Sequence, residues 1–128
     1  MATEIYGDEA ASLLVVDNTY HAPSLVFAET GNILWKKVRR GEITADESQQ
    51  LAVDLRNIAV ETVDPQGLLL EALDIALAID DTVYDAMYLA LAVRLDTKLI
   101  TADERLAQKT AGSALADHVI SIRDFHHS

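Results

Sequence analysis

The stretch Val83-Tyr84-Asp85-Ala86-Met87-Tyr88-Leu89-Ala90-Leu91-Ala92, followed closely by Lys98-Leu99-Ile100-Thr101, decides the fold class. Beyond Asp85 the first segment is almost entirely apolar or alanine, which predicts a buried central helix over about Tyr84 to Leu95. The second segment is short and apolar, and it predicts a strand. A buried helix that leads into a short strand is typical of a sheet covered by helices.

Helices and strands alternate on both sides of this stretch. We expect helices over Glu9 to Val16, Ser24 to Arg40, a segment opened by Thr44, Asp64 to Ile79 and Asp103 to Lys109, and extended segments at Tyr20 to Ala22, Val60 to Val63 and His118 to Ile122. This alternation predicts a three-layer α/β/α domain with a mostly parallel sheet of four to five strands. Such a sheet needs a strongly apolar central strand, and none of the expected segments supplies one.

Local signals mark where several of these helices begin and end. Ser24 is a good N-cap, and Gly41 stands where glycine commonly follows the end of a helix. Thr44 and Glu47 have the spacing of a capping box. Asp64-Pro65 combines an N-cap residue with a proline at the first helical position. These signals predict element boundaries without reference to the rest of the fold.

Composition narrows the class of protein. A chain of 128 residues that is 50% hydrophobic predicts one globular domain over residues 1–128, with residues 125–128, including His126-His127, as a tail. The absence of cysteine excludes disulfides, thiolate zinc sites and iron–sulfur clusters. The acidic start of the chain lacks the pattern of an export signal, and the apolar segment Leu68 to Ile79 is too short to span a bilayer. We therefore expect a cytoplasmic protein that does not enter a membrane.

The net charge argues against a polyanionic ligand. The chain has 10 Lys and Arg against 21 Asp and Glu, a formal net charge of −11. Such a chain should repel nucleic acid over most of its surface. The one basic cluster is Lys36-Lys37-Val38-Arg39-Arg40, which lies at the end of an expected helix. A cluster there can be a solvated face that complements the helix dipole.

Two acids stand where an α/β sheet places its ligands, and a third candidate lies on a helix. Asp103 follows the strand that ends at Thr101, and Asp85 opens the buried helix after the short extended Thr82-Val83. Glu29 lies one turn into the expected helix that begins at Ser24, with Asn32 and Lys36 on the same face. Together these acids would form an oxygen-only site suited to Mg²⁺ or Mn²⁺. Taken singly, each acid can equally be a helix cap or a solvated side chain.

Other kinds of site receive less support. The chain has no glycine-rich phosphate loop and no motif that presents a nucleophile. His21 and His118 lack a partner at metal-ligand spacing. Trp35 and Phe27 are expected to be core or interface residues rather than stacking platforms for bases.

Three segments, taken together, resemble the PIN-domain ribonucleases. His21 to Asn32 and Arg39 to Ile43 resemble the "APxLxxxExxN…RRGxI" segment of that family. Val83 to Ala92 is similar to its "YDAxYLALA" helix, and Leu99 to Leu106 to its "LITADERL" element. Their order and spacing match, in particular, the VapC toxins of type II toxin–antitoxin pairs.

The resemblance implies roles for particular residues. Glu29, Asp85 and Asp103 would be three of the family's acidic metal-binding and catalytic residues, with Asn32 and Thr101 as neighbours. The implied reaction is Mg²⁺- or Mn²⁺-dependent hydrolysis of RNA phosphodiester bonds, which needs no protein nucleophile. Substrate binding would rely on the basic cluster, through Lys36, Arg39 and Arg40. The resemblance also implies a cognate antitoxin and a homodimer.

The chain departs from the family pattern at its beginning. The family opens with an apolar strand that ends in a first catalytic Asp, well before the Glu. Here Leu14-Val15-Val16-Asp17 imitates that strand, but Asp17 is close to Glu29 and the preceding residues match the helix that follows the strand in the family. We therefore expect that the central strand and its Asp are missing, with Asp17 as an alternative first Asp. The alternative function is a weakened or inactive PIN-fold module that binds an antitoxin or RNA without cleavage; a purely structural dimerisation domain would leave the three acids unexplained.

Overall fold

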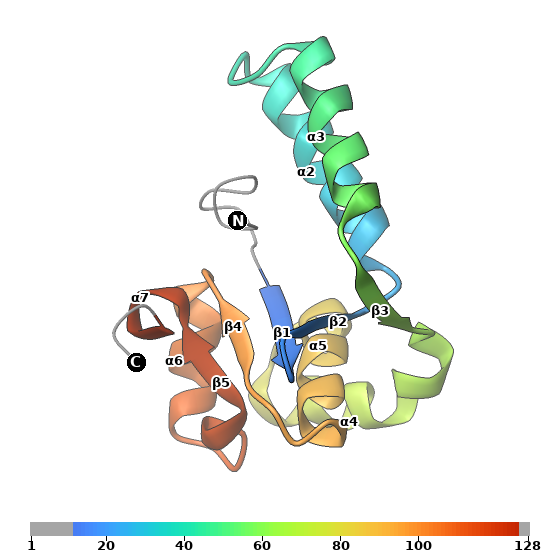
Figure 1. The fold of residues 1–128 in the computed structure, drawn as a ribbon. Helices are drawn as coiled ribbons and strands as arrows, with labels where there is room; N and C mark the ends of the chain where they lie inside the picture. Colours follow the sequence, from blue (N-terminus) through green and yellow to red (C-terminus); the bar gives the residue numbers. More distant parts are fainter. Residues whose placement is uncertain (1–11, 126–128) are drawn as a thin grey trace.

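A five-stranded sheet organises the molecule. In the computed structural model, which describes residues 12–125, the strand order is β3-β2-β1-β4-β5 (Figure 1). The strands are β1 (Ser12–Val16), β2 (Thr19–Pro23), β3 (Val60–Val63), β4 (Leu99–Thr101) and β5 (Val119–Ser121). Strand β1 is antiparallel to both β2 and β4, whereas β2 is parallel to β3 and β4 is parallel to β5. Four strands therefore share one direction, which confirms the predicted α/β class with a mostly parallel sheet.

The central strand is the main departure from the predicted elements. Ser12–Val16 forms β1 and pairs on both sides, so the helix predicted over Glu9 to Val16 is wrong for these residues. Glu9 to Ala11 lie outside the described residues. Two features explain the difference: Leu13 to Val16 is an apolar run that ends in two β-branched residues, and Asp17-Asn18 forms a tight turn. Both turn residues have positive φ, 49° and 64°, as a two-residue hairpin loop of the primed type requires.

The helices agree closely with the predicted segments except at the end of the chain, where Ile122 begins an unpredicted helix instead of ending the last strand. They are α2 (Val26–Arg39), α3 (Ala45–Asn57), α4 (Leu69–Ile79), α5 (Val83–Arg94), α6 (Glu104–Ala111) and α7 (Ile122–Phe125), with short 3₁₀ helices at Pro65–Leu68 and Ala116–His118. Phe125, predicted to begin a tail, ends α7, and His126 to Ser128 lie outside the described residues. Within residues 12–125, no helix combines the length and apolar character that crossing a membrane would need.

Most of the predicted caps are confirmed. Gly41 has a φ of +75° just beyond α2, and Thr44 and Glu47 form both hydrogen bonds of the capping box. Asp64 caps a 3₁₀ turn that leads into α4. The N-cap of α2, however, is Leu25 rather than Ser24, and it makes no side-chain capping bond. The chain there is instead anchored by a hydrogen bond from the Ser24 amide to the carbonyl oxygen of Val63 in β3.

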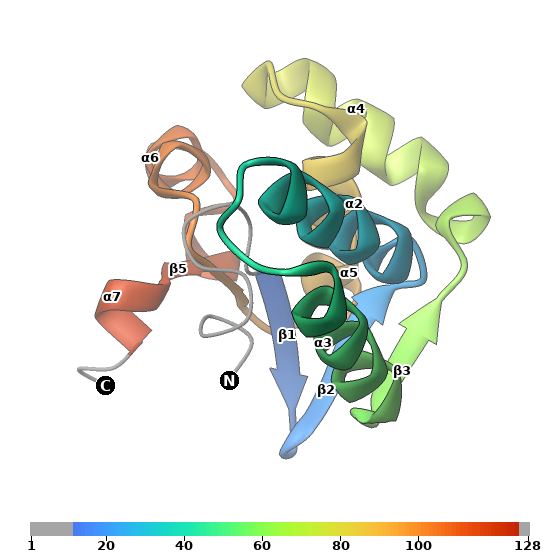
Figure 2. The same ribbon diagram turned by 90° about the horizontal axis from the view of Figure 1, so that it is seen from above.

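The buried helix lies at the centre of the core. Ala86 to Ala92 of α5 are all buried, and α5 contacts β1, β2 and β4. The core also includes Leu14 of β1 and Leu99 of β4. Helix α4 covers α5 from outside, as Figure 2 shows, while α2 and α3 form a hairpin that projects beyond the sheet (Figure 1). This packing fixes the first turn of α5, which carries Asp85, against the end of the sheet.

Strand direction determines which residues can meet. Strands β2 and β4 end at the same edge, and the register pairs Ser12, the start of β1, with Thr101, the end of β4. Asp17 follows the end of β1 and therefore lies at the opposite edge from Asp103. The alternative in which Asp17 is the first catalytic Asp is wrong for this reason. Within residues 12–125, the antiparallel β1 lies between β2 and β4, so no parallel strand between them brings an Asp to their shared edge. That the family's first Asp is missing stays a prediction.

Candidate metal-binding and catalytic site

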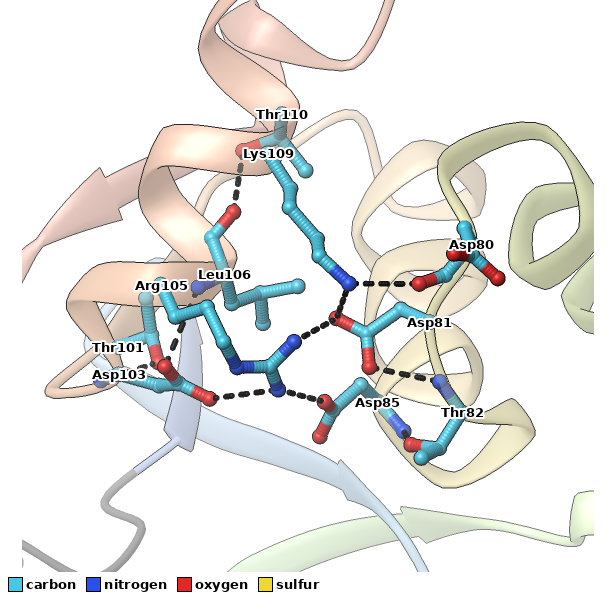
Figure 3. Close-up of polar contacts among 10 residues, drawn as sticks. All are labelled: Asp80, Asp81, Thr82, Asp85, Thr101, Asp103, Arg105, Leu106, Lys109 and Thr110. Atoms are coloured by element: carbon cyan, nitrogen blue, oxygen red, sulfur yellow. Dashed lines mark hydrogen bonds and ion pairs between the residues drawn. The ribbon is translucent and has the colours of Figure 1, made fainter.

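Asp85 is positioned by the start of α5. Thr82 is the extended N-cap residue, and its Oγ1 accepts a hydrogen bond from the Asp85 amide at 3.1 Å. The expected extended pair Thr82-Val83 is shorter than predicted, because Val83 is already helical. The Asp85 carboxylate is one-third exposed, and it faces the neighbouring helix α6 across the end of the sheet (Figure 3).

Asp103 is both a helix cap and a candidate ligand. Its amide donates to Oγ1 of the buried Thr101 at 3.0 Å, and its Oδ1 accepts from the Leu106 amide at 3.1 Å, which caps α6. Its second oxygen, Oδ2, lies 3.6 Å from an Arg105 nitrogen. Asp103 can therefore cap α6 through Oδ1 and bind a ligand through Oδ2 at the same time.

Arg105 joins three carboxylates at this edge. Its guanidinium lies 3.4 Å from Oδ2 of Asp81, 3.7 Å from Oδ2 of Asp85 and 3.6 Å from Oδ2 of Asp103 (Figure 3). Lys109, one turn further along α6, lies 4.0 Å from Oδ2 of Asp81 and donates to the backbone carbonyl of Asp80 at 2.6 Å. The site is therefore a network of three carboxylates and two basic side chains rather than of carboxylates alone.

Asp81 is the one acid around Arg105 that the sequence did not indicate as a candidate site residue. Its side chain is only 1% exposed, and its Oδ1 accepts a 2.6 Å hydrogen bond from the Thr82 amide. The sequence alone marks it only as part of Asp80-Asp81, a polar pair between the helices expected to end at Ile79 and to begin at about Tyr84. The one available signal was its position four residues before Asp85, which did not reveal that α6 would bring two cations to it.

Burial and neighbouring charges separate the pKa values of these acids. Burial, followed by a hydrogen bond and charge repulsion from Asp81 and repulsion from Asp103, raises the pKa of Asp85 to about 7. Burial acts to raise the pKa of Asp81 as well. Hydrogen bonds from the Thr82 amide and with Asp85, together with the charges of Arg105 and Lys109, outweigh it, so the pKa of Asp81 is lowered. Near neutral pH the site therefore holds one titrating carboxyl beside an ionised one.

Glu29 is tied to the same helix as Asp85. It lies on the first turn of α2, and its Oε1 accepts a 2.6 Å hydrogen bond from the hydroxyl of Tyr88. Burial raises the pKa of Glu29, and the bond from Tyr88 partly offsets this rise. Tyr88 stands three residues after Asp85 on α5, so the two positions share a helix face. Tyr88 thus links Glu29 to α5, a contact that the sequence pattern, which suggested only a core position for this helix, did not predict.

The other predicted site residues are distributed along α2. Asn32 is exposed one turn beyond Glu29. Lys36, Arg39 and Arg40 lie at the far end of the helix, where with Trp35 they line a surface hollow of about 320 Å³. Trp35 and Phe27 are exposed, so neither is a core residue as one of the two predicted alternatives had it. The basic cluster is thus on the same helix as Glu29 but separate from the acids.

The acids fit a hydrated divalent cation better than a closed metal cage. Within residues 12–125, no group of three or more His, Cys, Asp or Glu side chains is close enough to enclose a metal ion. Asp85 and Asp103 nevertheless converge, since both approach the same Arg105 nitrogen. Mg²⁺ keeps several waters and is commonly bound by one or two carboxylates together with substrate phosphate. A pair of convergent carboxylates is consistent with that mode of binding.

Comparison with known proteins places the chain in a family. The PIN domain model matches residues 1–112. The chain is 37% identical over 91 residues to Ribonuclease VapC3 of Pyrobaculum aerophilum, covering 70% of each chain. It is 35% identical over 94 residues to Ribonuclease VapC1 of Mycobacterium tuberculosis, covering 73% of this chain and 70% of the relative. It is also 30% identical over 103 residues to Ribonuclease VapC9 of M. tuberculosis, covering 80% of each. The chain therefore belongs to the PIN domain family, as a VapC-like member.

Proposed function

We propose that this protein is a Mg²⁺- or Mn²⁺-dependent endoribonuclease, the toxin of a toxin–antitoxin pair that acts in the cytoplasm. The relatives named as VapC ribonucleases support the ribonuclease activity. The observation that carries the proposal is the approach of Asp85 and Asp103, from two different elements, to one point at the carboxyl edge of the sheet. Ligands of α/β proteins bind at this edge.

The side chains would divide the work as follows. A divalent cation, when bound, would lower the pKa of a coordinated water and neutralise charge on the phosphate. Asp85 and Asp103 would hold it through oxygens that do not serve as caps, and Glu29 would be kept in place by Tyr88. Arg105 would have to leave Asp85 and Asp103 at least in part, while its contact with Asp81 keeps it beside the phosphate. No side chain needs to act as a nucleophile.

A cleavage assay with two matched variants tests this proposal. Wild-type protein should cleave single-stranded RNA with Mg²⁺ or Mn²⁺ and lose the activity in EDTA. Asp85→Asn should reduce the rate at least about a hundredfold, because it removes a charge that holds the cation. Asp117→Asn, at an exposed position away from the site, should cleave like the wild type. Cleavage that survives in EDTA, or in Asp85→Asn, would overturn the proposal.

A second candidate is a PIN-fold module that binds RNA or an antitoxin without cleaving. It is favoured by the position of Arg105, which bridges three carboxylates, and by the lack of a closed group of three acids within residues 12–125. This candidate predicts RNA binding that does not depend on divalent cations and no cleavage under any metal condition.

We also propose two protein partners, a second copy of the chain and a cognate antitoxin. Exposed leucines on α4 support the first, because an apolar stripe on one helix suits a symmetric contact between identical subunits. The net charge of −11 supports the second, since it would attract a basic antitoxin segment. The RNA would be held by Lys36, Arg39 and Arg40, the one basic cluster of the sequence.

A further inference from the structure

An exposed tryptophan stands among the basic residues of α2. Trp35 is 52% exposed, and the guanidinium carbon of Arg39 lies 5.0 Å from the centre of its ring. Lys36 and Arg40 complete the wall of the same surface hollow, about 320 Å³ in volume. The exposed indole therefore lies among positively charged side chains.

The charges of this surface are largely left for a partner. Lys37 is paired with Glu42 at 3.6 Å, but in the part of the chain that the structure describes neither Lys36 nor Arg39 forms an ion pair with a carboxylate. In a protein with a net charge of −11, Lys36 and Arg39 are therefore two neighbouring cations that no carboxylate of residues 12–125 neutralises. It attracts an anion, and the indole beside it attracts a flat ring.

Helix geometry relates this surface to Glu29. Lys36 follows Glu29 by two helical turns and lies on the same face of α2, about 10 Å further along the axis. An extended strand whose phosphate lies beside Glu29 can therefore reach the end of the helix with a neighbouring nucleotide. In a duplex the bases are stacked on one another, so their faces are not offered to a protein side chain.

We infer that Trp35, Lys36 and Arg39 form a base-stacking platform for RNA outside the acidic site: the Trp35 ring stacks on an unpaired base, and the two cations contact the adjacent phosphates. The choice of RNA as the ligand rests on the proposed function. The platform adds to it a base-contacting residue outside the acidic site. Stacking on an aromatic ring tolerates any base, so the platform does not select sequence.

The experiment uses the fact that Trp35 is the single tryptophan of the chain. Oligoadenylate is titrated into the full-length protein in EDTA, so that binding is measured without cleavage, and tryptophan fluorescence is recorded. We expect quenching that saturates, and much less quenching by the duplex of the same oligoadenylate with oligouridylate. Saturable quenching that is equal for both forms, or no quenching, would overturn the inference.

Three variants separate stacking from charge. By anisotropy of labelled oligoadenylate, Trp35→Leu should weaken binding by about tenfold, and Trp35→Phe by much less because it keeps a ring. Arg39→Gln should weaken binding and reduce its salt dependence. Lys98→Gln removes one exposed positive charge at the opposite edge of the sheet and should have little effect. Loss that is equal in Lys98→Gln and Arg39→Gln, or unchanged binding in Trp35→Leu, would overturn the platform.

The binding measurements and the cleavage assay can succeed or fail separately. Quenching without cleavage under any metal condition would support the platform and refute the ribonuclease proposal. Cleavage with no quenching and unchanged binding in Trp35→Leu would support the ribonuclease proposal and refute the platform. Quenching by a basic peptide but not by RNA would assign the surface to a protein partner and overturn the inference.

Discussion

At the residue scale, the acids that follow strands or open buried helices were predictable, and their partners were not. Asp85 and Asp103 could be singled out because strand direction determines which positions meet at the carboxyl edge of a sheet. Asp81 could not, because its importance comes from burial and from Arg105 and Lys109, which reach it from α6. Contacts between side chains of different elements depend on packing that no local pattern encodes.

Asp85 should lower the stability of the fold when it is ionised. Its pKa is raised to about 7 in the folded state, above the unfolded value of about 3.9. The folded state thus binds the proton more tightly, and the free energy of unfolding falls as pH rises between these values. Asp85→Asn should therefore be more stable than the wild type at pH 8, by about 1–2 kcal/mol after allowance for partial exposure.

Thermal unfolding measured at pH 8 and at pH 4 checks this expectation. The advantage of Asp85→Asn should shrink toward pH 4, where the wild-type carboxyl is protonated in the folded state and about half protonated in the unfolded state. Asp117→Asn serves as the control for the loss of one negative charge. An Asp85→Asn protein that is less stable than the wild type at pH 8 would show that the ionised carboxyl is well accommodated.

Asp81 should contribute to stability rather than oppose it. Its buried carboxylate is paired with Arg105 and Lys109, so Asp81→Asn would remove the buried charge that both cations contact. We expect a loss of about 2–3 kcal/mol in the free energy of unfolding. Denaturant unfolding measures it, with Asp80→Asn as the neighbouring control. A loss of similar size in both variants would contradict the distinct role of Asp81.

At the element scale, helices with local signals were predictable, and the central strand was not. The capping box of Thr44 and Glu47 and the glycine after α2 depend only on residues a few positions apart, and both are confirmed. Ser12–Val16 has an apolar pattern that fits a helix or a strand. Its pairing with β4, more than eighty residues later, decides between them.

A substitution in the β1–β2 turn tests the strand. Asn18 has a φ of 64° between two paired strands, a conformation that glycine adopts without strain. Asn18→Gly should raise the free energy of unfolding by about 0.5–1 kcal/mol. Asn57→Gly, at the end of α3, should lower it, since glycine weakens helices. If Asn18→Gly lowered the free energy of unfolding by as much as Asn57→Gly does, the hairpin between β1 and β2 would be excluded.

At the scale of the whole molecule, α4 presents the most apolar surface. Leu70 and Leu77 are 78% and 75% exposed, and Leu69 and Leu73 lie on the same stripe, which spans about 100° of the helix. We expect this stripe to pack against a second copy. Leu70→Glu with Leu77→Glu should shift the protein to monomer in sedimentation analysis, whereas Val53→Glu on α3 should not. A wild-type protein that is monomeric at high concentration would refute this contact.

The central claim is that Asp85 and Asp103 together hold the cation needed for RNA cleavage. Calorimetric titration with Mn²⁺ at pH 8, above the raised pKa of Asp85, tests it most directly, because no RNA is needed. The wild type and Asp117→Asn should bind Mn²⁺ alike, and Asp85→Asn and Asp103→Asn should each weaken binding by at least about tenfold. Asn at position 103 can still cap α6, so the fold should be kept. Unchanged Mn²⁺ affinity in both site variants would contradict the claim.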